Sequence, residues 1–389
     1  MKKKYVNLIV ILSIFLMISG IFGYKRKAFA FNNENLKSKS CYLMDYNSGT
    51  VIFKNNEDLR LPIASMCKIM TLLICFDSLE KQEISLDEKI TISENASCMG
   101  GSQIFLEEGG QYLINELVKG IVVASANDAC VAMAERICGS EENFVEKMNN
   151  KARELGMNNT NFVNCTGLPK PGQYSSSKDV AIMFSNLLKH NKYFDYSNIW
   201  MDKIEHPKDR ITEISNTNKL IRFYEGCDGG KTGYTSEAGH CLSATASRNG
   251  MRLIAVVISA PDSKTRFKEV SDMFNFGFNN YVNKLVIDNK TPLDLVVNVK
   301  GGKKDVVKVV SDKEIFIFSK KNEQCDFEVN FEPVKVAKAP IKKGDVLGKL
   351  SVFKNGLEVC SSNIVSCEEI NKRDYFDVIN KIILNWSIN

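Results

Sequence analysis

The hydrophobic pattern changes near Asn280, and this change constrains the fold more than any other feature of the sequence. Before it, long apolar segments with helical character lie between strand-turn-strand patterns. After it the helical periodicity disappears, and short alternating runs such as LDLVVNV, DVVKVV and EIFIFS are separated by Gly-Gly and lysine-rich turns. The 389 residues therefore predict a mixed domain of helices and strands over residues 31–280 and a small all-β domain over residues 281–368.

Local signals place several elements within the first of these domains. Residues 41–56 predict two strands joined by an Asn-Ser-Gly turn, and residues 241–260 predict a second hairpin that turns at Asn249-Gly250. Ser140 is well placed to cap a helix that runs to Leu155. Further helices are predicted after Pro62, over residues 113–123 and, after a break at 125–127, over residues 128–137.

The first thirty residues have the pattern of an export signal. A basic start is followed by an apolar run over residues 6–23, and Ala28-Phe29-Ala30 fits a signal-peptidase site. We therefore expect an exported protein whose mature chain starts near Phe31. The apolar run is long and is followed by Lys25-Arg26-Lys27, so an uncleaved membrane anchor is the alternative.

The other chain end predicts a second contact with a membrane surface. Residues 369–389 have the pattern of an amphipathic helix, and their apolar face ends in a tryptophan. Such a helix can lie in the membrane interface, or it can dock on its own domain. The residues on its apolar face are Tyr375, Ile379, Ile382, Ile383 and Trp386.

Charge and metal-ligand patterns exclude two classes of partner. The formal net charge is +5, but the first thirty residues hold six Lys and Arg and no acidic residue, so residues 31–389 carry about −1. No basic surplus remains to predict nucleic-acid binding. The three histidines are isolated, and the twelve cysteines form no Cys-x-x-Cys pair, so we expect no metal site. The cysteines are interpreted mainly as small buried side chains, with one or two disulfides as the alternative.

Residues 64–71, ASMCKIMT, contain two candidate nucleophiles, Ser65 and Cys67. The Ser-x-x-Lys pattern occurs four times in the chain and decides nothing alone. If Ser65 starts a helix, Lys68 at i+3 lies on its face and can reach the hydroxyl, whereas Cys67 at i+2 points away into the packing. A lysine can act as the base only if burial or a second cation lowers its pKa. We therefore predict Ser65 as the nucleophile and a second cation nearby.

Two further motifs supply that cation and polar groups for a cleft. Lys231-Thr232-Gly233 occurs once, directly before the second hairpin, and Gly233 would let a substrate backbone approach the strand. Ser125-x-Asn127 lies in the break between two predicted helices, where a hydroxyl and an amide can face a cleft. Ser-x-Asn occurs five times and is weak alone, but the ordered set of three motifs is specific.

With these motifs, the sequence resembles the serine-type D-alanyl-D-alanine carboxypeptidases among the low-molecular-mass penicillin-binding proteins, peptidase family S11. The resemblance spans residues 36–370 and rests on PIASMCKIMT, MGGSQIFLEEGG, the segment from ASANDAC to NCTGLP, YSSSKDVA and DGGKTGYTSEAGHCLSATA. It implies a β-lactamase/transpeptidase-like α/β domain, with an antiparallel sheet flanked by helices and the active site between sheet and helices. A small β-sandwich domain follows. The family pattern usually has Thr where this chain has Cys67.

The resemblance also implies a role for each motif residue. Ser65 would be acylated, Lys68 would be its general base, and Ser125 would relay a proton to the leaving D-alanine. Asn127 would hold the substrate amide, and Lys231 would tune the electric field around Lys68 and Ser125. Thr232 and Arg266 would bind the terminal carboxylate, and the N–H groups of Ser65 and Tyr234 would form the oxyanion hole. Arg266 is placed only by its distance to Phe276-Gly277-Phe278, and a solvated arginine at a helix start is the alternative.

The expected function is removal of the terminal D-alanine from peptidoglycan stem peptides that end in D-Ala-D-Ala. Water would be the acceptor, no cofactor would be needed, and β-lactams would acylate the same serine. The enzyme would act at the outer face of the cytoplasmic membrane.

Three alternatives share some of these features. A β-lactamase has the same fold and motifs, but those of class A carry a Glu-x-x-Leu-Asn segment, and residues 128–230 contain no Leu-Asn pair. A penicillin-binding sensor or scaffold with poor turnover would keep all of the motifs. An unrelated exported binding protein would carry them by accident.

Overall fold

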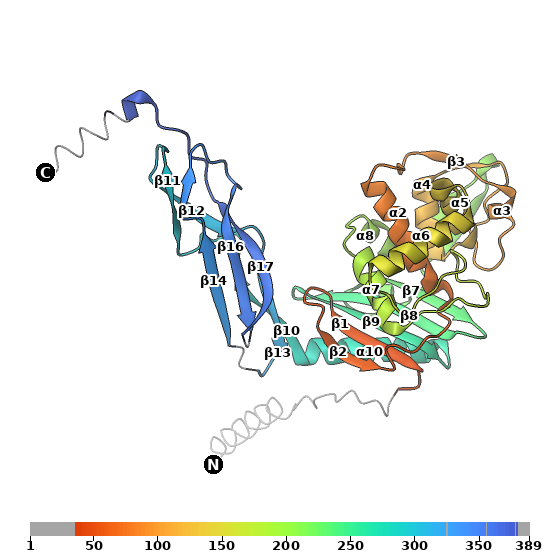
Figure 1. The fold of residues 1–389 in the computed structure, drawn as a ribbon. Helices are drawn as coiled ribbons and strands as arrows, with labels where there is room; N and C mark the ends of the chain where they lie inside the picture. The colour runs from red at the N-terminus through yellow and green to blue at the C-terminus, as the bar shows by residue number, and fades with distance from the viewer. Residues whose placement is uncertain (1–35, 324–325, 355, 378, 380–389) are drawn as a thin grey trace, which may run out of the picture. The chain divides into compact units, whose positions relative to one another are not determined.

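The computed structural model describes residues 36–323, 326–354, 356–377 and 379 (Figure 1). The predicted export segment over residues 1–30 lies outside the described residues, and so does most of the predicted C-terminal helix. The residues before and after Asn280 form separate sheets, and we describe each part by itself.

A five-stranded antiparallel sheet in the order β2-β1-β9-β8-β7 forms the centre of residues 36–280. Both predicted hairpins are present, β1–β2 and β8–β9. The second turns at Asn249 (φ 50°) and Gly250 (φ 75°), the two positive φ angles that a tight two-residue hairpin turn requires. The strands are β1 (Ser40–Asp45), β2 (Val51–Asn55), β7 (Cys227–Thr235), β8 (Gly239–Arg248) and β9 (Met251–Ala260).

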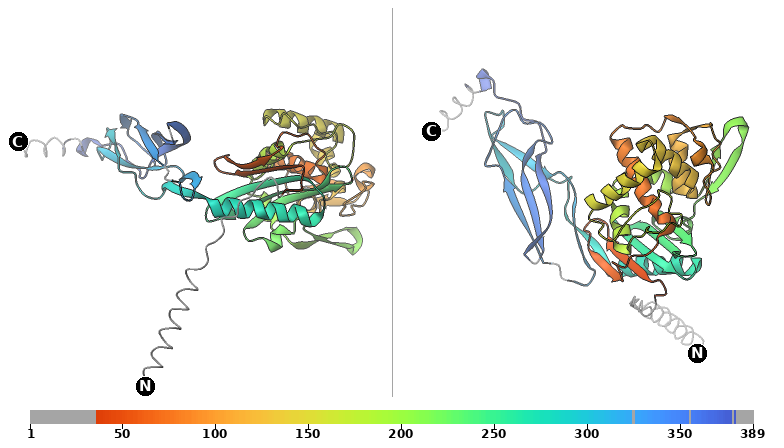
Figure 2. Two further views of the ribbon diagram at one scale, coloured as in Figure 1. Left: turned by 90° about the horizontal axis from the view of Figure 1, so that it is seen from below. Right: turned by 45° about the vertical axis from the view of Figure 1, so that its right-hand side comes forward.

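Helices cover both faces of this sheet. Figure 2 shows α10 (Ser263–Asn280) along one face and most of the other helices on the opposite side. The predicted break is present, because a π-helical turn over Gly120–Ala124 separates α4 from α5. Ser140 caps α6 as predicted, with its side chain accepting the N–H of Asn143. The other helices are α2 (Lys68–Glu80), α3 (Glu94–Ser97), α4 (Ile114–Lys119), α5 (Asn127–Cys138), α6 (Glu141–Glu154), α7 (Ser177–Leu187), α8 (Tyr193–Ser197) and α9 (Leu220–Phe223).

Two small two-stranded sheets lie outside the main sheet. β3 (Lys89–Thr91) pairs with β4 (Gln111–Leu113), and β5 (Met201–Glu205) pairs with β6 (Ile211–Ser215). The main core lies between the sheet and the helices, and α2 is its centre, with ten of its thirteen residues buried.

The residues after Asn280 form the predicted all-β domain. A six-stranded sheet has the order β14-β16-β17-β12-β11-β15, and β10 pairs with β13 in a two-stranded sheet. Alternate residues point into one core, which Ile315 and Ile317 of β13 share with the larger sheet. The strands are β10 (Tyr281–Ile287), β11 (Val296–Lys300), β12 (Val306–Ser311), β13 (Ile315–Lys320), β14 (Phe327–Pro333), β15 (Val336–Lys338), β16 (Val346–Lys354) and β17 (Leu357–Ser366).

The predicted C-terminal helix starts later than residue 369. Ile370 is buried in the β-domain core and pairs with Ile341, which keeps this stretch of backbone extended. Helical residues begin at Tyr375, so residues 369–374 correct the predicted boundary. Within the described parts of the chain, no helix has the length and apolar character needed to cross a membrane.

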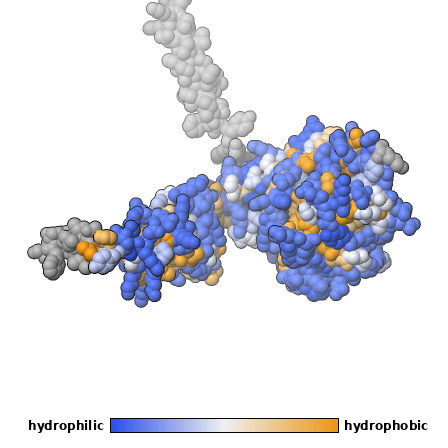
Figure 3. Space-filling view, turned by 90° about the horizontal axis from the view of Figure 1, so that it is seen from above, coloured by the Kyte–Doolittle hydropathy of each residue, from blue (hydrophilic) through white to orange (hydrophobic). Residues whose placement is uncertain are grey.

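The surface shown in Figure 3 is mostly hydrophilic, with apolar residues in small groups between hydrophilic ones.

Most of the cysteines lie in the interior of the protein. Seven of those in the described residues are buried, and Cys98 is exposed. Burial raises the pKa of the Cys130 thiol and of the Cys227 thiol to about 12. The interpretation of the cysteines as packing residues therefore fits these seven.

Candidate active site

The nucleophile turn is the junction between strand β2 and helix α2. Residues Ala64–Cys67 form a single 3₁₀ turn that leads directly into α2, so residues three apart lie above one another. Within residues 63–70, Ser65 is the one side chain that is not buried. The Lys68 Nζ lies 3.0 Å from the Ser65 Oγ and donates a second hydrogen bond, of 2.6 Å, to the carbonyl oxygen of Thr166. The structure therefore brings this predicted pair into contact.

Cys67 points away from this pair. Its thiol donates to the carbonyl oxygen of Asn164 at 3.3 Å, and its side chain is fully buried. Burial raises the pKa of the Cys67 thiol well above its ordinary value, so the thiolate that would attack a substrate is strongly disfavoured. Cys67 is a packing residue.

Lys68 and Lys231 are two buried amines. Burial lowers the pKa of Lys68. Burial and then the charge of Lys68 hold the pKa of Lys231 well below its ordinary value. The two amines are therefore close enough for their charges to interact, and the role of Lys231 as the second cation stays a prediction. A neutral Lys68 can act as a base toward Ser65.

The break between α4 and α5 presents two unsatisfied polar atoms. Ser125 adopts a left-handed conformation (φ 62°) at the end of the π-helical turn, and Asn127 starts α5. The Asn127 Nδ2 donates to the carbonyl oxygen of Gly100 at 2.7 Å. Both the Ser125 Oγ and the Asn127 Oδ1 are buried and have no partner among the described residues. Buried polar atoms need a partner, so these two are available to a substrate.

The loop that contacts Asn127, from Gly100 to Leu106, is held in place by residues that the sequence analysis did not single out. Asp128 accepts backbone N–H groups from Ile104, Leu106 and Ala129 at 2.9–3.2 Å. Arg210 of the β5–β6 hairpin donates to the carbonyl oxygen of Phe105 at 2.6 Å. The loop is thereby held beside Asn127, whose own N–H donates to the carbonyl oxygen of Ser102 at 2.7 Å.

Strand β7 carries Lys231, Thr232 and Gly233, and it passes directly over the nucleophile turn. A Cβ on Gly233 would lie 2.7 Å from the carbonyl oxygen of Ile63 and 3.1 Å from the Ser65 nitrogen. Gly233 therefore permits a close approach between β7 and the nucleophile turn, and its expected role toward a substrate backbone stays a prediction. Lys231 and Thr232 are both buried. Tyr234 is 58% exposed and stacks on His240.

Arg266 lies in the first turn of α10 but is only 9% exposed. Its Nη1 donates to the carbonyl oxygen of Gly233 at 2.9 Å and to that of Cys241 at 3.2 Å. Burial lowers the pKa of its guanidinium. The alternative of a solvated arginine at a helix start is therefore wrong, and the structure brings Arg266 to the strand that carries the Lys231 motif.

This arrangement of a serine, a buried lysine, a second cation and two free polar atoms coincides with a family match. Residues 27–262 match the D-alanyl-D-alanine carboxypeptidase family, Peptidase_S11. The chain belongs to this family. As a member it is a serine-type carboxypeptidase, a hydrolase with the penicillin-binding protein fold. Residues 283–372 match the penicillin-binding protein 5 C-terminal domain, which agrees with the separate β domain.

Relatives of this carboxypeptidase cover almost its whole length. The D-alanyl-D-alanine carboxypeptidase DacF of Bacillus subtilis (strain 168) is 41% identical over 353 residues, 90% of each chain. Penicillin binding protein 5 from Haemophilus influenzae is similar in structure, with a TM-score of 0.67, 32% identity and coverage of 88% of this chain and 100% of that one. PBP3 from Streptococcus pneumoniae has a TM-score of 0.72, 26% identity and coverage of 86% and 99%. The fold predicted from the resemblance is confirmed.

Some residues that build the carboxypeptidase site carry no side-chain signal in the sequence. Thr166 contributes only its carbonyl oxygen, which no residue type marks, although NCTGLP is part of the family resemblance. Asp128 follows Asn127 directly and could have been singled out as an acidic residue at a helix start. Its role depends on a loop more than twenty residues earlier, which local patterns do not predict.

We expect Asp128→Ala to lower the free energy of unfolding by about 3 kcal/mol or more, because it leaves three buried N–H groups without an acceptor. Urea denaturation of the parent, of this variant and of Asp87→Ala measures the loss. Asp87 is exposed and serves as the matched control. A loss no larger than that of the control would show that water replaces the carboxylate.

Proposed function

We propose that the protein removes the terminal D-alanine from peptidoglycan stem peptides through an acyl-enzyme on Ser65. The observation that carries the proposal is the 3.0 Å contact between the Ser65 Oγ and the buried Nζ of Lys68, with Lys231 as a second cation. A serine hydroxyl becomes a nucleophile only when a neighbouring base takes its proton, and an amine whose pKa is lowered by burial can do so in its neutral form.

The proposed reaction has two steps. Neutral Lys68 accepts the Ser65 proton while the Oγ attacks the carbonyl carbon of the scissile D-Ala-D-Ala bond. The negative charge on the carbonyl oxygen is stabilised by the backbone N–H groups of Ser65 and Tyr234. Ser125 gives its proton to the departing D-alanine nitrogen and takes the proton that Lys68 received from Ser65 in its place; water then hydrolyses the ester and returns a proton to the Ser65 oxygen.

Substrate contacts are assigned to the free polar groups of the cleft. The unpartnered Asn127 Oδ1 accepts a substrate amide N–H. Thr232 and Arg266 bind the terminal carboxylate, with Lys231 supplying positive charge beside them. β-Lactams, which present an amide carbonyl and a carboxylate in the same arrangement, acylate Ser65 and are held by its ester.

A peptidoglycan substrate implies that the enzyme acts outside the cytoplasm. Export through the N-terminal segment and attachment to the outer face of the cytoplasmic membrane fit a peptidoglycan substrate. The signal-like pattern of residues 1–30 and the amphipathic pattern of the tail support this proposal.

The test is release of free D-alanine from a peptide ending in D-Ala-D-Ala, measured beside the mass of the benzylpenicillin adduct and its lifetime. The proposal predicts steady release and a long-lived adduct on Ser65. A stable adduct without release would support the sensor alternative. Rapid loss of the adduct with opened penicillin as product would support a β-lactamase.

We expect the rate of acylation by benzylpenicillin to rise with pH through the pKa of Lys68 and then to level off, because only the neutral amine accepts the Ser65 proton. Burial lowers this pKa, so the rising limb should lie at lower pH than for an exposed lysine. In Lys231→Ala the limb should move to higher pH, since removing a nearby cation makes protonation of Lys68 easier. The groups that face Lys68 are Cys67, Asp128, Cys130, Cys165 and Lys231.

Stopped-flow acylation of the parent and of Lys231→Ala across a pH series measures both limbs. A rate that falls as the pH rises, or a parent limb at the pH of an ordinary lysine, would contradict Lys68 as the base.

A further inference from the structure

Strand β7 is irregular just before Lys231. Cys227 pairs with Ala246, and Gly229 pairs with Thr245, so Asp228 is an extra residue that pairs with nothing on β8. This is a β-bulge, which bends a strand and changes the direction of the side chains that follow. Bulges occur often beside active sites, and this one lies three residues before the buried Lys231.

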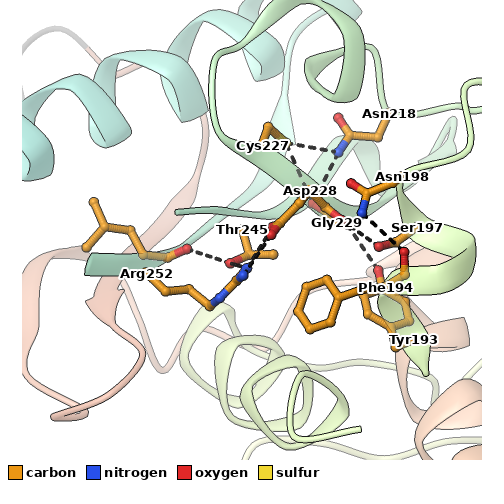
Figure 4. A network of polar contacts seen from close by, with 12 residues as sticks. Tyr193, Phe194, Ser197, Asn198, Asn218, Cys227, Asp228, Gly229, Thr245 and Arg252 are labelled. Carbon is orange, nitrogen blue, oxygen red and sulfur yellow. Dashed lines mark hydrogen bonds and ion pairs between the residues drawn. The ribbon is translucent and has the colours of Figure 1, made fainter. Parts of the chain in front are cut away.

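Side chains from helix α8 and the segment before β7 satisfy the backbone of the bulge (Figure 4). The Ser197 Oγ donates to the carbonyl oxygen of Asp228 at 2.5 Å. The N–H of Gly230 donates to the Tyr193 hydroxyl at 3.1 Å, and the Asn218 Nδ2 reaches the carbonyl oxygen of Gly229 at 3.4 Å. Three successive residues of the bulged strand therefore depend on polar groups from outside the sheet.

An ion pair fixes the same bulge from its other side. The guanidinium of Arg252 on β9 donates to both carboxylate oxygens of Asp228, at 2.6 and 2.7 Å. It also donates to the Thr245 Oγ1 at 3.2 Å and lies 4.7 Å from the ring centre of Phe194 on α8. A two-point contact of this kind fixes direction as well as distance. Figure 4 shows these contacts converging on Asp228 and Gly229.

Tyr193 is the member of this network whose hydrogen bond lies closest in sequence to Lys231. Its side chain is 1% exposed, and its hydroxyl bonds the nitrogen of Gly230, the residue before Lys231. Gly230 has φ 152°, and a Cβ there would lie 2.6 Å from the carbonyl oxygen of Ser243. The backbone at Gly230 is thus confined by both the sheet and Tyr193.

We propose that Tyr193 is a positioning residue that acts through Gly230 to aim Lys231 and Thr232 at the nucleophile turn. The inference rests on the proposed roles of these two residues. Without the tyrosine hydroxyl, the buried N–H of Gly230 lacks an acceptor, and the strand shifts to find one. Lys231 then moves relative to Lys68, and Thr232 moves relative to the substrate carboxylate.

The experiment compares Tyr193→Phe with Tyr196→Phe. Tyr196 is on the same helix, is 6% exposed, and donates its hydroxyl to the Asn115 Oδ1 at 2.7 Å, away from β7. Both variants lose one buried hydroxyl and one hydrogen bond. We expect Tyr193→Phe to lower kcat/KM for D-alanine release roughly ten-fold, the size expected for one buried hydrogen bond. Its rising limb of acylation rate should move to higher pH, while Tyr196→Phe keeps the parent profile.

Ser197→Ala is a second test of the same bulge, since it removes the donor to Asp228 and should shift the profile in the same direction. If Tyr193→Phe does not fold, the pH profile of Ser197→Ala decides whether the bulge positions Lys231. Equal kinetics and unchanged pH profiles for Tyr193→Phe and Tyr196→Phe, or for Ser197→Ala and the parent, would overturn the positioning role. Failure of the parent to release D-alanine in the same assay would contradict the proposed function instead, and the two outcomes are therefore separable.

Discussion

Ser65→Ala should reduce D-alanine release by roughly 10⁴- to 10⁶-fold, as loss of the nucleophile does in other serine hydrolases. The alanine leaves the fold intact, because Ser65 is partly exposed and, among the residues that the structure describes, its hydroxyl bonds only the Lys68 Nζ. It removes the hydroxyl that the proposed base contacts and leaves the hydrogen bond of Lys68 to the carbonyl oxygen of Thr166 in place. The variant should also form no covalent adduct with benzylpenicillin, as measured by intact-protein mass.

Cys67→Ala is the matched control, since it changes the other candidate nucleophile two residues away. The thiol is buried and bonded to the carbonyl oxygen of Asn164, so its loss costs packing rather than chemistry. We expect D-alanine release within a few-fold of the parent and a small loss of thermal stability. Release that survives Ser65→Ala but disappears in Cys67→Ala would exclude Ser65 as the nucleophile.

The nucleophile pair could be predicted from the sequence because its geometry is local. Ser65 and Lys68 are three residues apart, and any helical turn brings such residues together. The break before Asn127 and the turn at Asn249-Gly250 are local in the same sense. These three local features are present in the structure as predicted.

Local sequence patterns do not determine the contacts of Gly233 and Arg266. The sequence indicates that Gly233 permits a close approach, but only the packed sheet shows that Ile63 and Ser65 are the neighbours. The helix-start position of Arg266 fits a solvated side chain equally well until its bonds to strands β7 and β8 are known. Both depend on contacts between residues far apart in the sequence, for which a single sequence carries no signal.

Backbone polar groups, both N–H donors and carbonyl acceptors, are a further class of contact that a sequence does not reveal. The carbonyl oxygen of Thr166 binds Lys68, and the N–H of Gly230 binds Tyr193, yet every residue has such groups. Their importance comes from burial, which makes an unpaired polar group costly. The next residue, Gly167, is the position in this segment where a substitution should disturb the nucleophile most.

Gly167→Ala should disrupt the nucleophile turn directly. Gly167 has φ 83°, and a Cβ there would lie 2.1 Å from the carbonyl oxygen of Ala64 and 2.9 Å from the Ser65 nitrogen. These neighbours are backbone atoms, so either the Ser65 turn or the Thr166 segment has to move. A displacement of about 1 Å at a reacting group can cost roughly 10²-fold in rate. We expect at least that loss in acylation by benzylpenicillin, together with a lower free energy of unfolding.

Gly172→Ala separates the clash from the backbone conformation. Gly172 has φ 90°, but its added Cβ would meet only the Val163 Cγ1, at an ordinary 3.8 Å. Both variants force an alanine into the left-handed region, at about 1–2 kcal/mol. Only Gly167→Ala pushes on the turn that holds the nucleophile. Acylation by Gly172→Ala should therefore stay near the parent rate while its stability falls. Equal acylation rates for the two variants would mean that the contact between Gly167 and Ala64 does not position Ser65.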